Sequence, residues 1–166
     1  LPFYKDYDFL DNQIKQINHQ TLLPIRLIFI DDGNKDKKLK DFLISRLHKK
    51  ILLIYIKFDE NHGIYEGIKE GLKHIKSDFF RLNATDDIYY PDLSKKSLNL
   101  LYKYPKTNTI FSNSISNFYP NNKKIKLKLN FLKKESYSPL DVEGIFKKNQ
   151  FKIYHNTVFY RSNYFL

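Results

Sequence analysis

The chain has 166 residues, of which 42% are hydrophobic and 16% aromatic, and it contains no cysteine. This size and composition suit one domain with its own core and argue against a disordered chain. Disulfides and thiolate chemistry are excluded, and no apolar run reaches the ~18 residues that a membrane-spanning helix needs. Because no secretory signal pattern opens the sequence, we expect an intracellular protein.

The positive charge of the chain leaves its partners open. Lys and Arg number 29 against 18 Asp and Glu, which gives a formal net charge of +11. An AT-rich genome would explain the excess of lysine, and so would attraction to nucleotide phosphates, an anionic membrane face or nucleic acid. Since the lysines are spread along the chain rather than grouped, charge alone selects none of these.

The chain opens with the patterns of a strand end, a helix and a second strand. Residues 1–4 have the pattern of a strand end, and a helix is expected from about Asp8, which would be its N-cap. The apolar face of this helix comprises Phe9, Leu10, Ile14 and Ile17. Residues 25–30 form a nearly continuous apolar run, which is typical of a strand buried on both faces of a parallel sheet.

Two acidic residues follow this buried strand. Residues 31–36 read Asp-Asp-Gly-Asn-Lys-Asp, and Gly33 permits a tight turn there. Asp36 is placed to cap the next helix. The apolar face of that helix comprises Leu39, Phe42, Leu43 and Leu47. A turn followed by a helix start would by itself explain Asp31 and Asp32.

A third strand, residues 51–58, precedes a helix with two glycines. The helix is expected over residues 64–76. Its apolar face comprises Ile64, Ile68, Leu72 and Ile75. Gly67 and Gly71 lie within it at a spacing of four, and each glycine costs a helix ~1 kcal/mol. The pair therefore indicates close packing or close approach of a ligand, unless the helix is simply weak.

The most informative stretch is Thr85-Asp86-Asp87, which follows a short apolar strand at residues 79–82. Ligands of open α/β sheets bind at the carboxyl ends of strands, and adjacent carboxylates can hold a hard divalent cation through their oxygens. The alternative is a solvated turn in which Asp86 or Asp87 caps the following helix and Pro91 lies in its first turn.

The remaining segments complete an α/β pattern. Residues 91–104 are expected to be a helix and residues 109–112 a strand, so strands and helices alternate over the first 113 residues as in a mostly parallel sheet. Residues 123–131 alternate Lys with apolar residues and are expected to pair with residues 115–119 as a small antiparallel hairpin. A short helix at residues 141–149 and an apolar segment at residues 155–165 follow.

Six segments match one family in order and spacing. They are residues 2–5, Gln20-Thr21, residues 31–36, residues 61–67, residues 85–91 and residues 155–162. In this order they resemble the inverting family 2 glycosyltransferases, which have the GT-A nucleotide-sugar fold. The resemblance covers essentially the whole chain. Two departures are Ala84, where the metal motif of the family has its first Asp, and Lys69, where the family commonly has Asn.

The resemblance implies one GT-A domain over residues 1–166, truncated at both ends. It implies a metal-dependent, hexosyltransferase-like enzyme of polysaccharide biosynthesis that uses Mn²⁺ or Mg²⁺. The donor would be a nucleotide-diphosphate sugar, with a UDP-sugar favoured, and the acceptor a saccharide or a lipid-linked molecule. We expect the protein in the cytoplasm or at the inner membrane face, with peripheral membrane association suggested by family habit and charge.

The resemblance also assigns roles to the acidic loops. Asp87 would be a metal ligand, and Asp86 would bind the metal or the ribose. Asp31 and Asp32 would bind the nucleobase and ribose, because a carboxylate accepts hydrogen bonds from a uracil N–H or a hydroxyl. The nucleotide-binding set is completed by Pro2, Tyr4, Gly63 and Lys69. Lys69 would face the diphosphate as a point charge, unless it belongs to a solvated helix face.

An inverting transfer also needs a base that deprotonates the acceptor hydroxyl. Asp141 and Glu143 are weak candidates, because acidic residues suit a helix start for structural reasons alone. His155 is either near the acceptor or structural. The resemblance places the base beyond Leu166, so we expect this chain to bind donor nucleotide but to transfer sugar poorly or not at all.

Two other functions remain open from the sequence. The first is a catalytically silent nucleotide-binding module of the same fold. The second is a basic nucleic-acid-binding domain, but the chain has neither clustered basic residues nor a recognisable motif for it, and its two acidic loops argue against it. We therefore expect no nucleic-acid partner.

Overall fold

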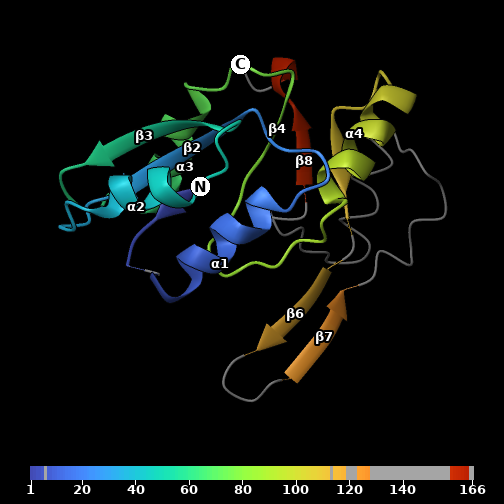
Figure 1. Ribbon diagram of the computed structural model, residues 1–166. Coiled ribbons are helices and arrows are strands. Elements are labelled where there is room, and N and C mark those ends of the chain that lie inside the picture. The colour runs from blue at the N-terminus through green and yellow to red at the C-terminus, as the bar shows by residue number, and fades with distance from the viewer. Residues whose placement is uncertain (6, 113, 119–122, 128–157, 165–166) are drawn as a thin grey trace.

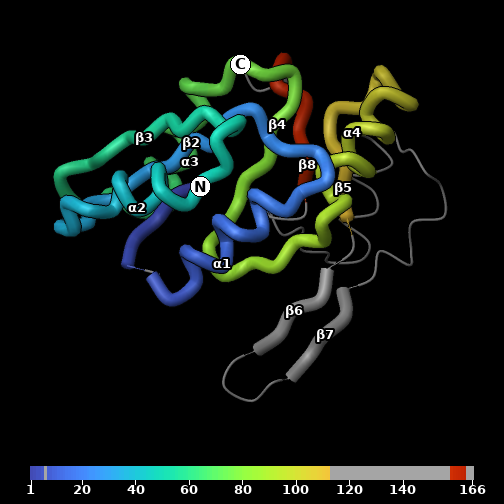
Figure 2. The backbone as a smooth tube through the Cα atoms, viewed as in Figure 1, coloured from blue at the N-terminus to red at the C-terminus, as the bar shows by residue number. Residues whose placement is uncertain are grey.

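A computed structural model describes residues 1–5, 7–112, 114–118, 123–127 and 158–164 (Figures 1 and 2). The helices are α1 (Tyr7–Asn18), α2 (Leu39–Arg46), α3 (Ile64–Leu72) and α4 (Leu93–Lys103), with a 3-10 turn at Ser162–Tyr164. The strands are β1 (Pro2–Phe3), β2 (Arg26–Asp32), β3 (Leu52–Phe58), β4 (Phe79–Arg81), β5 (Thr109–Phe111), β6 (Ser114–Phe118), β7 (Lys123–Leu127) and β8 (Val158–Arg161). The predicted α/β class is confirmed.

The first sheet is parallel, with the strand order β1-β2-β3. Its central strand β2 is the predicted buried strand, and Phe29 and Ile30 on it are both fully buried. α1 and α2 pack on the Phe29 face of the sheet, where Ile14 of α1 and Leu43 of α2 join the same core. The continuous apolar run of β2 is explained by its burial on both faces.

α3 packs on the opposite face of the sheet, with its two glycines at the contact. A Cβ added at Gly67 would lie 3.4 Å from the Pro2 side chain, and one at Gly71 would lie 3.7 Å from that of Ile30. These are ordinary van der Waals distances that an alanine would also allow, so α3 packs directly on the sheet while a need for glycine at these positions stays a prediction. The helix ends at Leu72 rather than at residue 76, and Ile64, predicted on the apolar face, is exposed.

A second sheet has the strand order β4-β8-β5, and β8 runs antiparallel to both neighbours. The sequence predicted β4 and β5 but not the late strand between them. Arg161 of β8 links this strand to α4 and to the turn before β5, because its Nε donates to the Thr107 carbonyl (3.1 Å) and its Nη2 to the Leu101 carbonyl (2.9 Å). The predicted hairpin is confirmed, since β6 pairs antiparallel with β7.

Two details of the helix starts differ from the sequence predictions. α1 begins at Tyr7, so Asp8 lies in its first turn and is not the N-cap. Phe9 is 50% exposed, and the buried face carries Gln13 instead. Asp36 does not occupy the N-cap of α2, which is Lys38. Its Oδ1 accepts a hydrogen bond from the Lys38 N–H (2.8 Å) in the turn ahead of the helix.

A cavity of about 740 Å³ lies between β2 and α3 on one side and β4 and α4 on the other. Apolar side chains form most of its lining, among them Ile28, Leu72 and Phe80. Leu1 also lines it, and the Leu1 nitrogen donates to the Ile28 carbonyl (2.8 Å).

Candidate functional site

Asp31, at the end of β2, is fully buried, and both of its carboxylate oxygens accept hydrogen bonds from the protein. Its Oδ1 accepts from the Asn34 backbone N–H (3.0 Å) and from the Asn34 side-chain amide (2.7 Å), and its Oδ2 accepts from the Tyr55 hydroxyl. Burial, reinforced by this carboxylate, raises the pKa of Tyr55. Asp31 therefore fixes the turn after β2, and its predicted contact with a nucleotide stays a prediction.

Asp32 joins the end of β2 to the loop that precedes α3. Its Oδ1 accepts from the His62 N–H (2.7 Å) and its Oδ2 from the Gly63 N–H (3.0 Å). The side chain is 3% exposed. A carboxylate has about four acceptor positions, and the bonds to this loop occupy two of them. Gly63, assigned to nucleotide binding by resemblance, thus lies in direct contact with Asp32.

Asn34 links the ends of β1 and β2, which the sequence did not indicate. Its side-chain amide donates to the Phe3 carbonyl (3.3 Å), and its Oδ1 accepts from the Lys5 N–H (3.2 Å). Tyr4 follows β1 beside this link and is partly exposed. An asparagine directly after the turn glycine was the available signal in the sequence. Asn34 brings Tyr4 to the same edge of the sheet as Asp31.

Asp86 and Asp87 follow β4 and differ in exposure, since Asp86 is exposed and Asp87 half-buried. The Tyr89 hydroxyl donates to Oδ2 of Asp87 (3.1 Å), and the Arg81 guanidinium lies 3.9 Å from the centre of the Tyr89 ring. Burial and the nearby Asp87 carboxylate raise the pKa of Tyr89, which keeps its hydroxyl protonated. One carboxylate of the pair is therefore held in place, while the other faces solvent.

The capping alternative for this acidic pair is wrong. The N-cap residue of α4 is Asp92, and Pro91 precedes the helix instead of lying in its first turn. Asp92 pairs with Lys96 (2.6 Å) on the helix surface. Neither Asp86 nor Asp87 therefore serves the start of α4.

The donor atoms at Asp86 and Asp87 fit a cation shared with a ligand. Across the described residues, no group of three or more His, Cys, Asp or Glu side chains forms a self-sufficient metal site. Mg²⁺ is commonly held by one or two carboxylates together with substrate phosphates and water, and Mn²⁺ also favours oxygen ligands. Two adjacent carboxylates match that arrangement.

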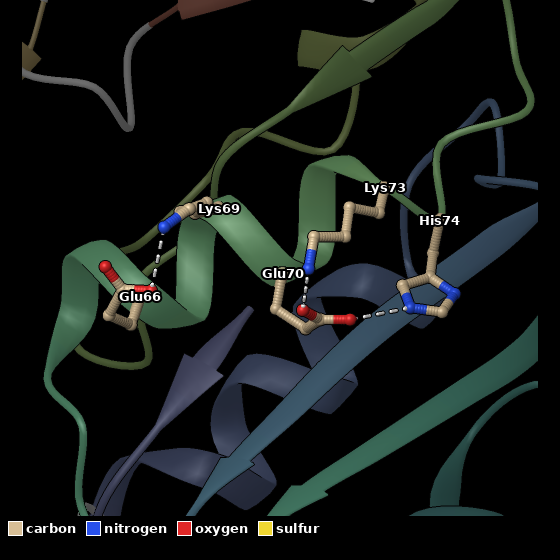
Figure 3. Close-up of polar contacts among 5 residues, drawn as sticks. All are labelled: Glu66, Lys69, Glu70, Lys73 and His74. Carbon is tan, nitrogen blue, oxygen red and sulfur yellow. Dashed lines mark hydrogen bonds and ion pairs between the residues drawn. The ribbon is translucent and has the colours of Figure 1, made fainter.

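Lys69 lies on the outer side of α3, away from the glycine face. Figure 3 shows it reaching back to Glu66, with 3.3 Å between Nζ and Oε2. One turn further on, Glu70 accepts hydrogen bonds from Lys73 and His74, which lower its pKa. These contacts agree with the alternative that Lys69 belongs to a solvent-exposed helix face. Its contact with a diphosphate stays a prediction. Asp141, Glu143 and His155 lie outside the described residues.

Comparison with known proteins identifies the family. The fold is an α/β sheet with acidic loops at the carboxyl ends of β2 and β4. The sequence matches the model of glycosyl transferase family 2 over residues 1–165, so the chain belongs to this family. The predicted resemblance is confirmed.

Curated relatives are glycosyltransferases that are themselves uncharacterised. One from Rickettsia bellii is 28% identical over 110 residues, which is 66% of this chain and 16% of the relative. One from Haemophilus influenzae is 31% identical over 101 residues, 60% of this chain and 31% of the relative. The chain thus matches no more than about a third of either protein.

A solved structure supports the GT-A fold. The structure of Staphylococcus aureus TarS 1-349 in complex with UDP superposes with a TM-score of 0.72 at 15% identity. The superposition covers 97% of this chain and 45% of TarS. At this identity the likeness shows the fold alone. In the described part of the chain, no helix has the length and apolar character that crossing a bilayer requires.

Proposed function

We propose that this chain is the donor-binding part of a glycosyltransferase that uses a nucleotide-diphosphate sugar, with a UDP-sugar favoured. The observation that carries the proposal is the presence of two acidic pairs after β2 and β4, in each of which one carboxylate, Asp32 or Asp87, is positioned by hydrogen bonds. Membership of glycosyltransferase family 2 and the UDP named for TarS support it.

The two acidic pairs would bind different parts of the donor, one the nucleoside and the other the metal at the diphosphate. Asp32, together with Asp31, would accept hydrogen bonds from the nucleoside. Asp87 and Asp86 would hold Mn²⁺ or Mg²⁺, which acts as a Lewis acid toward the departing diphosphate. Tyr89 keeps Asp87 oriented through the bond to Oδ2. The acceptor would be a saccharide or a lipid-linked molecule, as in polysaccharide biosynthesis at the inner membrane face.

The metal assignment predicts a specific loss in one variant. UDP affinity is expected to rise when Mn²⁺ is added, and Asp87→Asn should remove most of that gain, about tenfold or more, because the amide removes the ligand charge. Isothermal titration calorimetry with and without Mn²⁺ measures both quantities. Asp92→Asn is the matched control, since Asp92 is an acidic residue of the same segment that pairs with Lys96.

These titrations also separate the parts of the proposal. A full Mn²⁺ gain in Asp87→Asn would refute the metal assignment but leave nucleotide binding standing. Absence of UDP binding in the unmodified chain, with and without metal, would refute the donor-binding function itself.

A second prediction concerns transfer. Asp87 and Asp86 are assigned to the metal, and a carboxylate bound to a cation is a poor proton acceptor. We therefore expect the 166-residue chain to bind donor but to consume it slowly, as a silent nucleotide-binding module would. A donor-consumption assay over a panel of acceptors measures this. Fast transfer that Asp141→Asn or Glu143→Gln abolishes would place the base within this chain.

A further inference from the structure

Two glutamines, Gln16 on α1 and Gln20 just after its end, contact the segment that carries the proposed metal ligand. In Figure 1 this segment, which runs from β4 to α4, passes beside α1. Gln16 Nε2 donates to the Asp87 carbonyl (3.1 Å), and Gln16 Oε1 accepts from the Tyr89 N–H (2.6 Å). One side chain thus binds the backbone on both sides of Ile88.

Gln20, two residues beyond the end of α1, repeats this contact toward α4. Its Nε2 donates to the Tyr90 carbonyl (3.0 Å), and its Oε1 accepts from the Ser94 N–H (3.2 Å) and hydroxyl (2.9 Å). The next residue adds a backbone bond, from the Thr21 N–H to the Pro91 carbonyl (2.7 Å). The segment from Asp87 to Ser94 is therefore held along its length by the last turn of α1 and the residues that follow it.

A side-chain amide is suited to hold an irregular loop, because it can bond to both kinds of backbone group. An irregular loop leaves backbone N–H and C=O groups that need partners, and a glutamine carries both a donor and an acceptor at the end of one side chain. Gln16 binds the backbone carbonyl of Asp87, while Tyr89 binds its carboxylate. Asp87 is thus fixed at its backbone and at its side chain.

We propose that Gln16 is a positioning residue for the cation site at Asp87, with Gln20 supporting the rest of the segment. This inference rests on the proposed donor-binding function. Removal of the Gln16 amide frees the backbone at Asp87 while leaving the carboxylate in the sequence. Loss of such a supporting contact typically costs a metal site about 10- to 100-fold in affinity.

Gln13 provides a matched control on the same helix. It is fully buried, and neither its Nε2 nor its Oε1 has a hydrogen-bond partner. Gln13→Leu therefore makes the same chemical change as Gln16→Leu at a buried position whose amide makes no hydrogen bond to the segment. It should leave metal and nucleotide binding unchanged.

The test measures the Mn²⁺-dependent gain in UDP affinity by calorimetry. Gln16→Leu is expected to keep the metal-free UDP affinity and to lose about tenfold or more of the gain, whereas Gln13→Leu keeps both. Gln16→Glu retains the acceptor for the Tyr89 N–H but not the donor to the Asp87 carbonyl. Its gain should lie between those of the wild type and Gln16→Leu, which a general loss of folding would not produce.

The outcomes separate this inference from the proposal on which it rests. An Mn²⁺ gain that Asp87→Asn abolishes but both Gln16 variants retain overturns the positioning role alone. A chain that binds UDP with no Mn²⁺ gain overturns the metal site and this inference together. Equal losses in the Gln13 and Gln16 leucine variants would also overturn it, because the effect would then come from the helix and not from the contact.

Discussion

Replacement of Gly33 by alanine is expected to lower the free energy of unfolding by about 2–6 kcal/mol. Gly33 has φ = +80°, and a Cβ there would lie 2.4 Å from the Glu60 carbonyl carbon and 2.5 Å from the Asn61 nitrogen. The unusual φ costs a non-glycine residue about 1–3 kcal/mol. The clash adds about 1–3 kcal/mol, because backbone atoms cannot rotate away as a side chain does.

Gly63→Ala separates the two costs. Gly63 has φ = +85°, but a Cβ there would meet no atom within 4 Å. It should therefore incur the conformational cost of about 1–3 kcal/mol without the clash. Urea denaturation of both variants measures the difference between them. If they are equally stable, the loop at residues 60–61 does not approach Gly33 as the structure describes.

The sequence predicted the elements whose signals are local. The apolar run of β2 predicted a strand buried on both faces, and the glycine after Asp32 predicted the turn. Such patterns depend only on residues within the segment itself, so one sequence is enough to recognise them. For the same reason the β6–β7 hairpin was predicted, since its two strands are close together in the chain.

The second sheet was only partly predicted, because its pairing is not local. β8 lies between β4 and β5 in the sheet, although at least 46 residues lie between it and either strand in the sequence (Phe111 to Val158). The sequences of the three-residue strands β4 and β5 indicate apolar strands, but they do not indicate which strand pairs with them. The same limit applies to Gln16, whose partners lie 71 and 73 residues away.

The candidate site shows a further limit of sequence patterns. Asp31 and Asp32 are chemically identical neighbours, and the sequence treated them as a pair. Adjacent residues of a strand point to opposite faces, so Asp31 turns toward Tyr55 inside the sheet and Asp32 toward the loop before α3. Their different environments follow from the strand geometry and not from the motif.

Because of this difference, we expect removal of the Asp32 carboxylate to lower both the stability of the fold and the affinity for UDP. Asp32→Ala leaves the N–H groups of His62 and Gly63 without their acceptor, and bonds to a charged group contribute about 1.5–3 kcal/mol each. We expect a loss of about 3 kcal/mol in the free energy of unfolding. UDP affinity without metal should fall about tenfold or more, since the nucleoside loses a charged acceptor.

Asp32→Asn distinguishes the two losses, because an amide keeps one acceptor oxygen for the loop but carries no charge. It should regain part of the stability lost in Asp32→Ala, as measured by urea denaturation, while metal-free UDP affinity stays low by calorimetry. Wild-type UDP affinity in the asparagine variant would show that Asp32 acts on the nucleotide only by holding the His62–Gly63 loop. A low affinity in a variant of near-native stability would require that the carboxylate itself bind the nucleoside.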